Sequence, residues 1–334
     1  FMASRIELLL TQAQQVYNQN FTDECWFERA VFLSWYCSLG DCTFCYMSTQ
    51  KNKIKNPALA KRKLSSILAE ILITKKMGWK VEFLSAGYGA HKPEELQEIV
   101  KRSSIVAGEK LWLNIGYLTE AQVKPLLLYI KGVSISLETV NWKLRKKVCP
   151  SKPVAPLLKT LKLADKYKLK KAITIIIGLG ETEEDLNELF KFVEKCKIDR
   201  ITFYALNPHA GTPFTAGPNK EYYLQWITNT RIRFPKLEII AGTWVNRLDE
   251  LHLLLRAGAN AFTKLPALKL VGSKDASKIE KEVKLTHRRL KCGFSKFPKA
   301  NWKREISALK LEKTLKNDIY TKLQQYLKRK ERLE

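Results

Sequence analysis

Short apolar runs alternate with longer amphipathic segments along most of this chain of 334 residues, and this alternation restricts the fold more than any other feature. The run at 172–177 (AITIII) is almost continuously apolar, as expected for a strand that is covered on both faces of a parallel sheet. Eight such runs occupy residues 30–36, 81–85, 111–115, 133–137, 172–177, 200–206, 237–241 and 261–264. Eight β/α units predict an α/β fold with a TIM-type (β/α)8 or partial barrel, and a doubly wound open sheet is the alternative.

The barrel is expected to carry a segment at each end. Residues 1–28 are predicted to form a leading helix (5–21) and a lead-in, and residues 29–273 the barrel. Residues 274–334 form a basic extension with 19 Lys and Arg against 8 Asp and Glu. Within it, apolar residues at intervals of three and four over 302–333 predict an amphipathic helix that lies on a partner or on the barrel.

The composition excludes several classes of protein. Hydrophobic residues make up 45% of the chain, enough to fill a core, which excludes a disordered or fibrous chain. No apolar run approaches the roughly 20 residues of a membrane span, and the start of the chain lacks the layout of a secretion signal. We therefore expect a cytoplasmic protein. The seven cysteines are an odd number and three fall within nine positions, which favours metal binding over disulfides.

Unusual residues follow the predicted strands directly. They lie at 37–45, 85–91 (SAGYGAH), 137–139 (LET), 178–182 (GLGET) and 207–214 (NPHAGTPF). Because active sites of (β/α)8 barrels lie at the carboxyl ends of the strands, these segments are expected to meet at one site.

Three cysteines, Cys37, Cys42 and Cys45, share the loop after the first predicted strand, and no histidine lies nearby. Clustered thiolates are typical ligands of iron–sulfur clusters. Three ligands to a 4Fe-4S cluster would leave one iron open for a substrate or cofactor. A zinc site is the competing interpretation, but it needs a second ligand pair that the sequence lacks.

These cysteines, with Phe44 directly before the third and a β/α barrel behind them, resemble the radical S-adenosylmethionine (SAM) enzymes, in particular the biotin-synthase-like branch. The resemblance covers most of residues 5–270 and includes AQQVYNQNF (13–21), IIGLGET (176–182) and AGANA (257–261). The usual cysteine spacing in that superfamily is three residues and then two. Here four residues separate Cys37 from Cys42, which sets the chain apart from the standard subgroups.

The resemblance implies that the open iron binds the amino and carboxylate groups of SAM. The reduced cluster then cleaves SAM to a deoxyadenosyl radical that abstracts hydrogen from an unactivated carbon. Phe44 and Tyr46 would flank the adenine, and the segment of Ser85 and Gly87 would bind the amino group through its carbonyls. The other implied SAM contacts are Glu138, Arg145, Ile176, Gly178, Glu181, Tyr204 and Asn207, and the candidate substrate contacts are His209 and Thr212.

Three further cysteines, Cys25, Cys149 and Cys292, could bind a second 4Fe-4S cluster if the fold brings them together. Biotin synthase and lipoyl synthase use such an auxiliary cluster as their source of sulfur. Ala172 stands where biotin synthase carries a cluster cysteine, whereas LETV at 137–140 resembles lipoyl synthases. The nearest resemblance is therefore to the two-protein lipoyl synthase found mainly in archaea.

On this interpretation the chain is a sulfurtransferase of the lipoyl synthase type, and its substrate is an octanoyl chain on an acidic lipoyl carrier domain. It would work with a paralogous radical SAM partner and an electron donor such as ferredoxin. The net charge of +26 is then interpreted as attraction to an acidic protein, with nucleic acid a less favoured partner.

Two alternatives remain open. One is another biotin-synthase-like radical SAM enzyme, such as the one that starts the pyridinol cofactor of iron-only hydrogenase, with a single cluster. The other is a basic iron–sulfur protein that binds or modifies RNA, which predicts an aromatic stacking surface among the basic residues.

Overall fold

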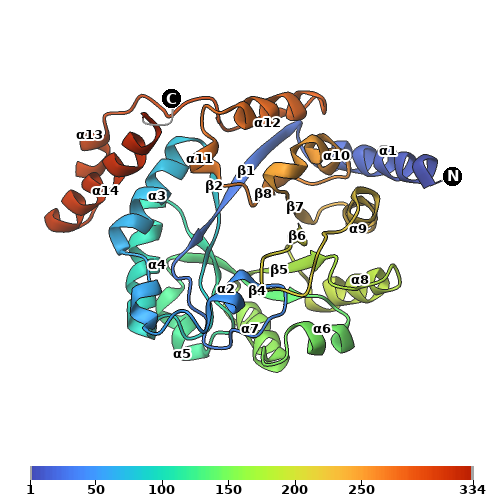
Figure 1. Ribbon diagram of the computed structural model, residues 1–334, viewed down its shortest axis with the longest axis horizontal. Coiled ribbons are helices and arrows are strands. Elements are labelled where there is room, and N and C mark those ends of the chain that lie inside the picture. Colours follow the sequence, from blue (N-terminus) through green and yellow to red (C-terminus); the bar gives the residue numbers. More distant parts are fainter. Residues whose placement is uncertain (1, 332–334) are drawn as a thin grey trace.

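Eight parallel strands close into a barrel in the computed structural model, which describes residues 2–331 (Figure 1). The strands follow one another around the barrel in sequence order, and the first closes it by pairing with both the eighth and the second. The predicted (β/α)8 barrel is therefore confirmed and the open sheet is excluded. The strands are β1 (Glu24–Phe32), β2 (Lys80–Ser85), β3 (Leu111–Asn114), β4 (Ile130–Glu138), β5 (Lys170–Ile177), β6 (Arg200–Ala205), β7 (Glu238–Gly242) and β8 (Ala261–Thr263).

Helices between the strands cover the outside of the barrel (Figure 1). Their ends follow local rules: α4 begins at Pro93 with two glutamates in its first turn and ends at Ala107, and Gly108 caps it with a left-handed φ of 76°. The helices are α2 (Tyr46–Gln50), α3 (Leu64–Lys76), α4 (Pro93–Ala107), α5 (Glu120–Val123), α6 (Trp142–Val148), α7 (Val154–Lys166), α8 (Asp185–Cys196), α9 (Lys220–Arg233), α10 (Leu251–Arg256) and α11 (Ala267–Leu270), with 3-10 turns η1 (Pro57–Ala60), η2 (Lys124–Leu126) and η3 (Val245–Glu250).

Strand β1 begins six residues before the predicted run at 30–36 and ends at Phe32. The polar residues Glu24, Glu28 and Arg29 interrupt the apolar pattern that the prediction relied on. Glu28 is nevertheless fully buried, because its partner Arg200 reaches it across the barrel. The predicted boundary between residues 28 and 29 therefore falls inside a strand.

Charged residues fill the barrel at the amino ends of the strands. Arg200 of β6 donates hydrogen bonds to Glu28 of β1 and Glu238 of β7, each at 2.7 Å. Its guanidinium also lies 5.0 Å from the ring centroid of Trp112 of β3. Because this layer occupies the lumen at one end, the space for a ligand lies at the carboxyl ends of the strands.

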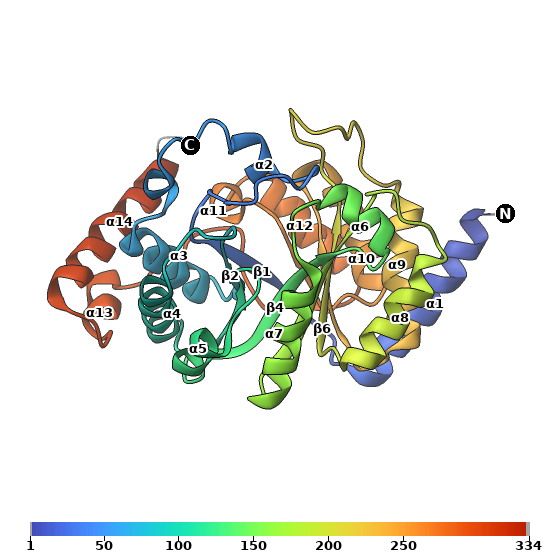
Figure 2. The same ribbon diagram turned by 90° about the horizontal axis from the view of Figure 1, so that it is seen from below.

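The two terminal segments pack on the barrel. Helix α1 (Met2–Asn20) lies against α9 and α10, and α12 (Lys274–Lys284) also contacts α10. The short β9 (Arg289–Leu290) pairs with the start of β1. Helices α13 (Trp302–Ser307) and α14 (Lys313–Glu331) follow, and α14 lies along α3 (Figure 2).

The basic extension therefore packs on the outside of the barrel and shares an apolar cluster with it. Ile319 and Leu323 of α14 are fully buried in the same apolar cluster as residues of α3. The single helix predicted over 302–333 is divided between α13 and α14 at residues 308–312, and residues 332 and 333 lie outside the described residues. Among the described helices, none has the length and apolar character needed to cross a membrane.

Candidate functional site

The loop at residues 33–45 carries the three predicted cluster ligands from the carboxyl end of β1 to the start of α2. Cys37, Cys42 and Cys45 are all free and partly exposed. Cys45 directly precedes α2, and its N–H donates to the carbonyl of Cys42 at 3.1 Å, so these two cysteines share one turn. We name residues 33–45 the cysteine loop.

Two neighbouring loops hold the cysteine loop in place. The Ser38 N–H donates to the Tyr88 carbonyl at 2.9 Å. On the other side, the Thr43 N–H donates to the Val148 carbonyl, also at 2.9 Å. The loop is thus fixed between the segment after β2 and the end of α6.

Gly87 packs directly against the cysteine loop. A Cβ added there would lie 2.3 Å from the Tyr36 carbonyl oxygen and 2.6 Å from the Cys37 Cβ. No side chain fits in that space, so the glycine of SAGYG is required for packing. Ser85 ends β2, and its carbonyl accepts from Leu33 at 2.8 Å.

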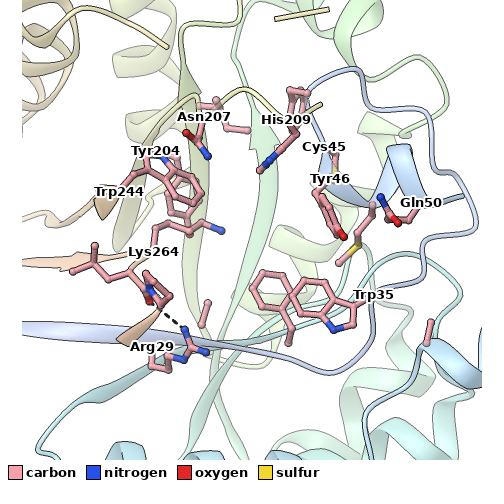
Figure 3. Close-up of a pocket in the computed structure, with 18 of the residues that line it drawn as sticks. Arg29, Trp35, Cys45, Tyr46, Gln50, Tyr204, Asn207, His209, Trp244 and Lys264 are labelled. Carbon is pink, nitrogen blue, oxygen red and sulfur yellow. Dashed lines mark hydrogen bonds between the residues drawn. The ribbon is translucent and has the colours of Figure 1, made fainter. Parts of the chain in front are cut away.

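A large cavity of about 1530 Å³ opens beside the cysteine loop at the carboxyl ends of the strands (Figure 3). This volume exceeds the roughly 300–1,000 Å³ of an ordinary small-molecule site, which leaves room for a cofactor and a substrate together. Six of the residues predicted to contact SAM or substrate line it, together with the predicted ligand Cys45: Phe44, Tyr46, Ile176, Tyr204, Asn207 and His209.

The two predicted substrate contacts have different positions. The His209 ring lies 5.7 Å from the Tyr46 ring and lines the cavity, and burial lowers its pKa. Thr212 does not line this cavity, and its hydroxyl donates to the His209 carbonyl at 2.7 Å. The threonine therefore closes the turn that presents the histidine.

A smaller hollow of about 380 Å³ lies beside α6, and the predicted residues Arg145 and Cys149 line it together with Lys152. Glu138 ends β4 with φ at 69°, a left-handed conformation that is uncommon outside glycine. Its carboxylate pairs with the Lys152 ammonium at 2.5 Å, and both side chains are buried. Arg145 donates to the Leu137 and Lys152 carbonyls, each at 2.9 Å. The three charges are thus held rigidly behind the cysteine loop.

The turn after β5 differs from its expected role. Glu181 was predicted to line the adenine, but its carboxylate accepts the N–H groups of Gly178, Leu179 and Gly180 at 2.6–3.2 Å. Burial raises the pKa of Glu181. Gly178 has φ at 106° and therefore needs to be glycine. Glu181 therefore stabilises the turn, and Ile176, at the end of β5, lines the cavity.

The structure does not bring the three auxiliary cysteines together. Cys149 lies beside the cysteine loop, where its thiol is hydrogen-bonded to that of Cys42. Cys25 is near the start of β1, and Cys292 accepts from the Phe27 N–H at 3.4 Å. From Cys25 to the end of β1 is about 23 Å at 3.3 Å per residue. Cys25 and Cys292 therefore lie at the amino end of the barrel and Cys149 at its carboxyl end. The three cysteines form no common ligand set.

The surroundings of Cys42 and Cys45 favour the protonated thiol in the protein alone. Hydrogen bonding to Cys149 and burial raise the pKa of Cys42, and burial raises that of Cys45. A metal would have to displace these protons when it binds. Within residues 2–331, no three His, Cys, Asp or Glu side chains are already gathered in a metal-binding arrangement.

Two unsatisfied groups beside the loop test whether a ligand fits here. Nη2 of Arg145 and the hydroxyl of Tyr88 are buried, and neither has a hydrogen-bond partner in the described part of the chain. Buried polar groups are seldom left unpaired, so these two suit a polar ligand that supplies acceptors. With three soft thiol ligands on the adjacent loop, the donor set fits an iron–sulfur cluster with a polar cofactor.

Several cavity residues were not singled out from the sequence. They are Arg29, Trp35, Trp244 and Lys264 (Figure 3). Lys264 offered one signal, because it is the single charged residue in the predicted strand 261–264 (AFTK) and stands at its carboxyl end. The other three lie on β1 or in loops, where no spacing pattern points into the barrel.

Comparison with known proteins agrees with this geometry. Residues 34–193 match the radical SAM superfamily and residues 202–281 match the Biotin and Thiamin Synthesis associated domain. The uncharacterized protein MJ0597 of Methanocaldococcus jannaschii is 40% identical over 87% of this chain and 82% of its own length. Biotin synthase of Nitrosopumilus maritimus is 30% identical over 56% of this chain, which spans 60% of that enzyme.

Among solved structures, methylornithine synthase (PylB) has a similar fold. Its TM-score is 0.71 at 19% sequence identity, and the match covers 85% of this chain and 89% of PylB. At this identity the likeness concerns the fold alone.

Proposed function

The chain belongs to the radical SAM superfamily, in its biotin-synthase-like branch, and from this premise we propose that it breaks a C–H bond of a substrate held in the large cavity beside the cysteine loop. One observation carries the proposal: Phe44, Cys45 and Tyr46 belong to the cysteine loop or directly follow it, and they also line that cavity. The cluster and SAM, when bound, supply the electron and the radical chemistry.

The residues behind the cysteine loop are proposed to hold SAM. The free Nη2 of Arg145 would bind its carboxylate, since a buried guanidinium N–H needs an acceptor. Lys152 holds Glu138 in place through their 2.5 Å ion pair. Gly87 allows the backbone after β2 to approach the loop closely enough to contact the same ligand.

The cavity itself is proposed to orient the substrate and to exclude water. Trp35 packs on Phe32 with ring centroids 5.0 Å apart, and Tyr46 meets Trp35 edge-on at 6.3 Å. Rigid aromatic walls of this kind bind apolar surface and keep a reactive radical from side reactions.

The test uses anaerobically reconstituted protein with SAM and a chemical reductant. We expect release of deoxyadenosine, and we expect Cys42→Ser to reduce it to the level of a protein-free control because one of three ligands is lost. Cys196→Ser is the matched control, because Cys196 lies at the end of α8, outside the cysteine loop. Deoxyadenosine release that persists in Cys42→Ser would refute the proposal.

Sulfur insertion into a protein-bound octanoyl chain is a second candidate. The 30% identity to a biotin synthase supports sulfur chemistry, and the apolar cavity suits an acyl chain. The acidic carrier domain, the paralogous partner and a ferredoxin-like donor all belong to this proposal. It requires a second cluster, and Cys25, Cys149 and Cys292 cannot all be ligands of that cluster.

Iron content separates the two candidates. Sulfur insertion predicts about eight irons per chain and a single-cluster enzyme about four. If about four are found, and Cys149→Ala and Cys292→Ala leave that number unchanged, the sulfur-insertion candidate fails. A content near eight that falls in Cys149→Ala would favour it.

A further inference from the structure

Lys264 brings a positive charge into an otherwise aromatic part of the cavity. It directly follows β8 and lines the cavity opposite Trp35, with its side chain directed inward (Figure 3). Its ammonium lies 4.5 Å from the ring centroid of Tyr204 and 5.5 Å from that of Phe32. Its φ of 75° is left-handed, a conformation that non-glycine residues keep mainly where the surrounding structure demands it.

The ammonium of Lys264 has neither a hydrogen bond nor an ion pair among the residues that the structure describes. The nearby carboxylate of Glu82 is already occupied, because its two oxygens accept the hydroxyls of Tyr204 and Thr263. Burial raises the pKa of Glu82 and lowers that of Lys264. Lys264 is partly exposed, and its ammonium has only the rings of Tyr204 and Phe32 beside it, so this position suits a ligand that supplies an acceptor.

The surroundings of Lys264 add further positive charge. Arg29 and Arg62 each pair with Glu70 at 2.7 Å, so two cations share one carboxylate. Although burial alone would raise the pKa of Glu70, the two arginines hold it below its usual value. More cations than carboxylates line the whole cavity. The cations are Arg29, Lys53, Lys55, Arg62 and Lys264, and the carboxylates are Glu28 and Glu70. Glu28 is itself bound to Arg200.

The facing wall is apolar. It includes Trp35, Tyr46, Ile54 and Leu59. Leu59 is 84% exposed and Trp35 is 44% exposed, so this wall has apolar surface that a ligand could cover. The cavity therefore combines the cations around Lys264 with apolar surface on the facing side, where Lys53 and Lys55 flank Ile54.

We propose that the substrate is a carboxylate with an apolar body, whose carboxylate binds Lys264 and whose body lies against Trp35 and Leu59. The inference rests on the proposed function and narrows its substrate class. An ammonium at the end of β8 would fix the carboxylate at one point of the cavity, which Cys45 also lines. An octanoyl amide on a carrier protein has no carboxylate, so this substrate class differs from that of the second candidate.

Matched pairs of carboxylate and amide test this inference. Octanoate and octanamide, and 3-phenylpropanoate and its amide, are titrated calorimetrically into the reconstituted full-length protein with SAM present. We expect at least one carboxylate to bind more tightly than its amide. In Lys264→Met, which keeps the apolar stem, the dissociation constant of that carboxylate should rise at least about tenfold while that of the amide stays unchanged.

Two controls separate binding from folding and from radical chemistry. Lys269→Met changes a lysine of α11 that is exposed and does not line the cavity, and it should leave all affinities unchanged. Amide binding in Lys264→Met reports that the cavity is still formed, and SAM affinity should also be unchanged. Deoxyadenosine release is measured separately, so a failure of the proposed function can be recognised on its own.

The inference is overturned if neither carboxylate is preferred over its amide in the native protein. It is also overturned if the preference survives in Lys264→Met, or if that substitution weakens SAM instead, which would make Lys264 a cofactor contact.

Discussion

Single residues at the site combine local rules with contacts that only the fold supplies. Gly87 illustrates this, since the Tyr36 carbonyl of a different loop leaves no room for a side chain there. The requirement for glycine therefore does not come from its own turn. Glu181 is the opposite case, because its carboxylate is consumed by three N–H groups within its own turn. A motif residue can therefore be structural even where it lies next to a ligand cavity.

Gly87→Ala should displace the cysteine loop. The new Cβ would lie 2.6 Å from the Cys37 Cβ, so the loop must shift, and the expected loss of stability is about 1–3 kcal/mol. Iron content after anaerobic reconstitution should fall below that of the native protein. Gly293→Ala is the matched control because nothing lies within 4 Å of its added Cβ. Equal iron loading in the two variants would show that this contact does not position the loop.

Helices and strands likewise combine local sequence signals with contacts that only the fold supplies. Seven of the eight strands lie close to the apolar runs that predicted them, because burial on both faces leaves a continuous apolar signature. Strand β1 begins six residues before the run that predicted it, since its buried Glu28 is paired with Arg200, which is distant in the sequence. The apolar stripe of α14 predicted that one face of this helix is packed. Only the structure shows that this face packs on α3.

Leu323→Ala tests the packing of α14 on α3. Leu323 is fully buried, so its truncation should lower the free energy of unfolding by about 2–5 kcal/mol. Leu285→Ala makes the same change at a side chain that is 60% exposed and should stay within about 0.5 kcal/mol. Chemical denaturation measures both. Similar values for the two variants would mean that α14 contributes little to the core.

At the scale of the whole molecule, the barrel is filled by charge at one end and open at the other. Arg200 connects β6 to β1 and β7 across the lumen, and Glu28 is completely buried beneath it. This closed end directs any ligand to the opposite end, where the cysteine loop and the cavity lie.

Arg200→Met should destabilise the whole barrel. It leaves the buried carboxylate of Glu28 without its cation, with only the Trp26 indole N–H as a donor, at an expected cost of about 3–5 kcal/mol. Adding Glu28→Gln should recover part of that loss, which a double-mutant cycle of unfolding free energies would measure. Arg233→Met removes an exposed ion pair with Glu194 and should cost less than about 1 kcal/mol. Strict additivity of the two lumen substitutions would contradict the coupling.

The sequence by itself determined the eight-unit barrel, the cysteine loop and the family resemblance, because apolar periodicity and clustered thiols are local signals. The tertiary structure decided what depends on distant residues meeting. It separated Cys149 from Cys25 and Cys292, which the sequence grouped as possible ligands of one cluster with Cys149 the first choice. It also placed Lys264 in the cavity beside Arg29, because the carboxyl ends of β8 and β1 become neighbours only when the barrel closes.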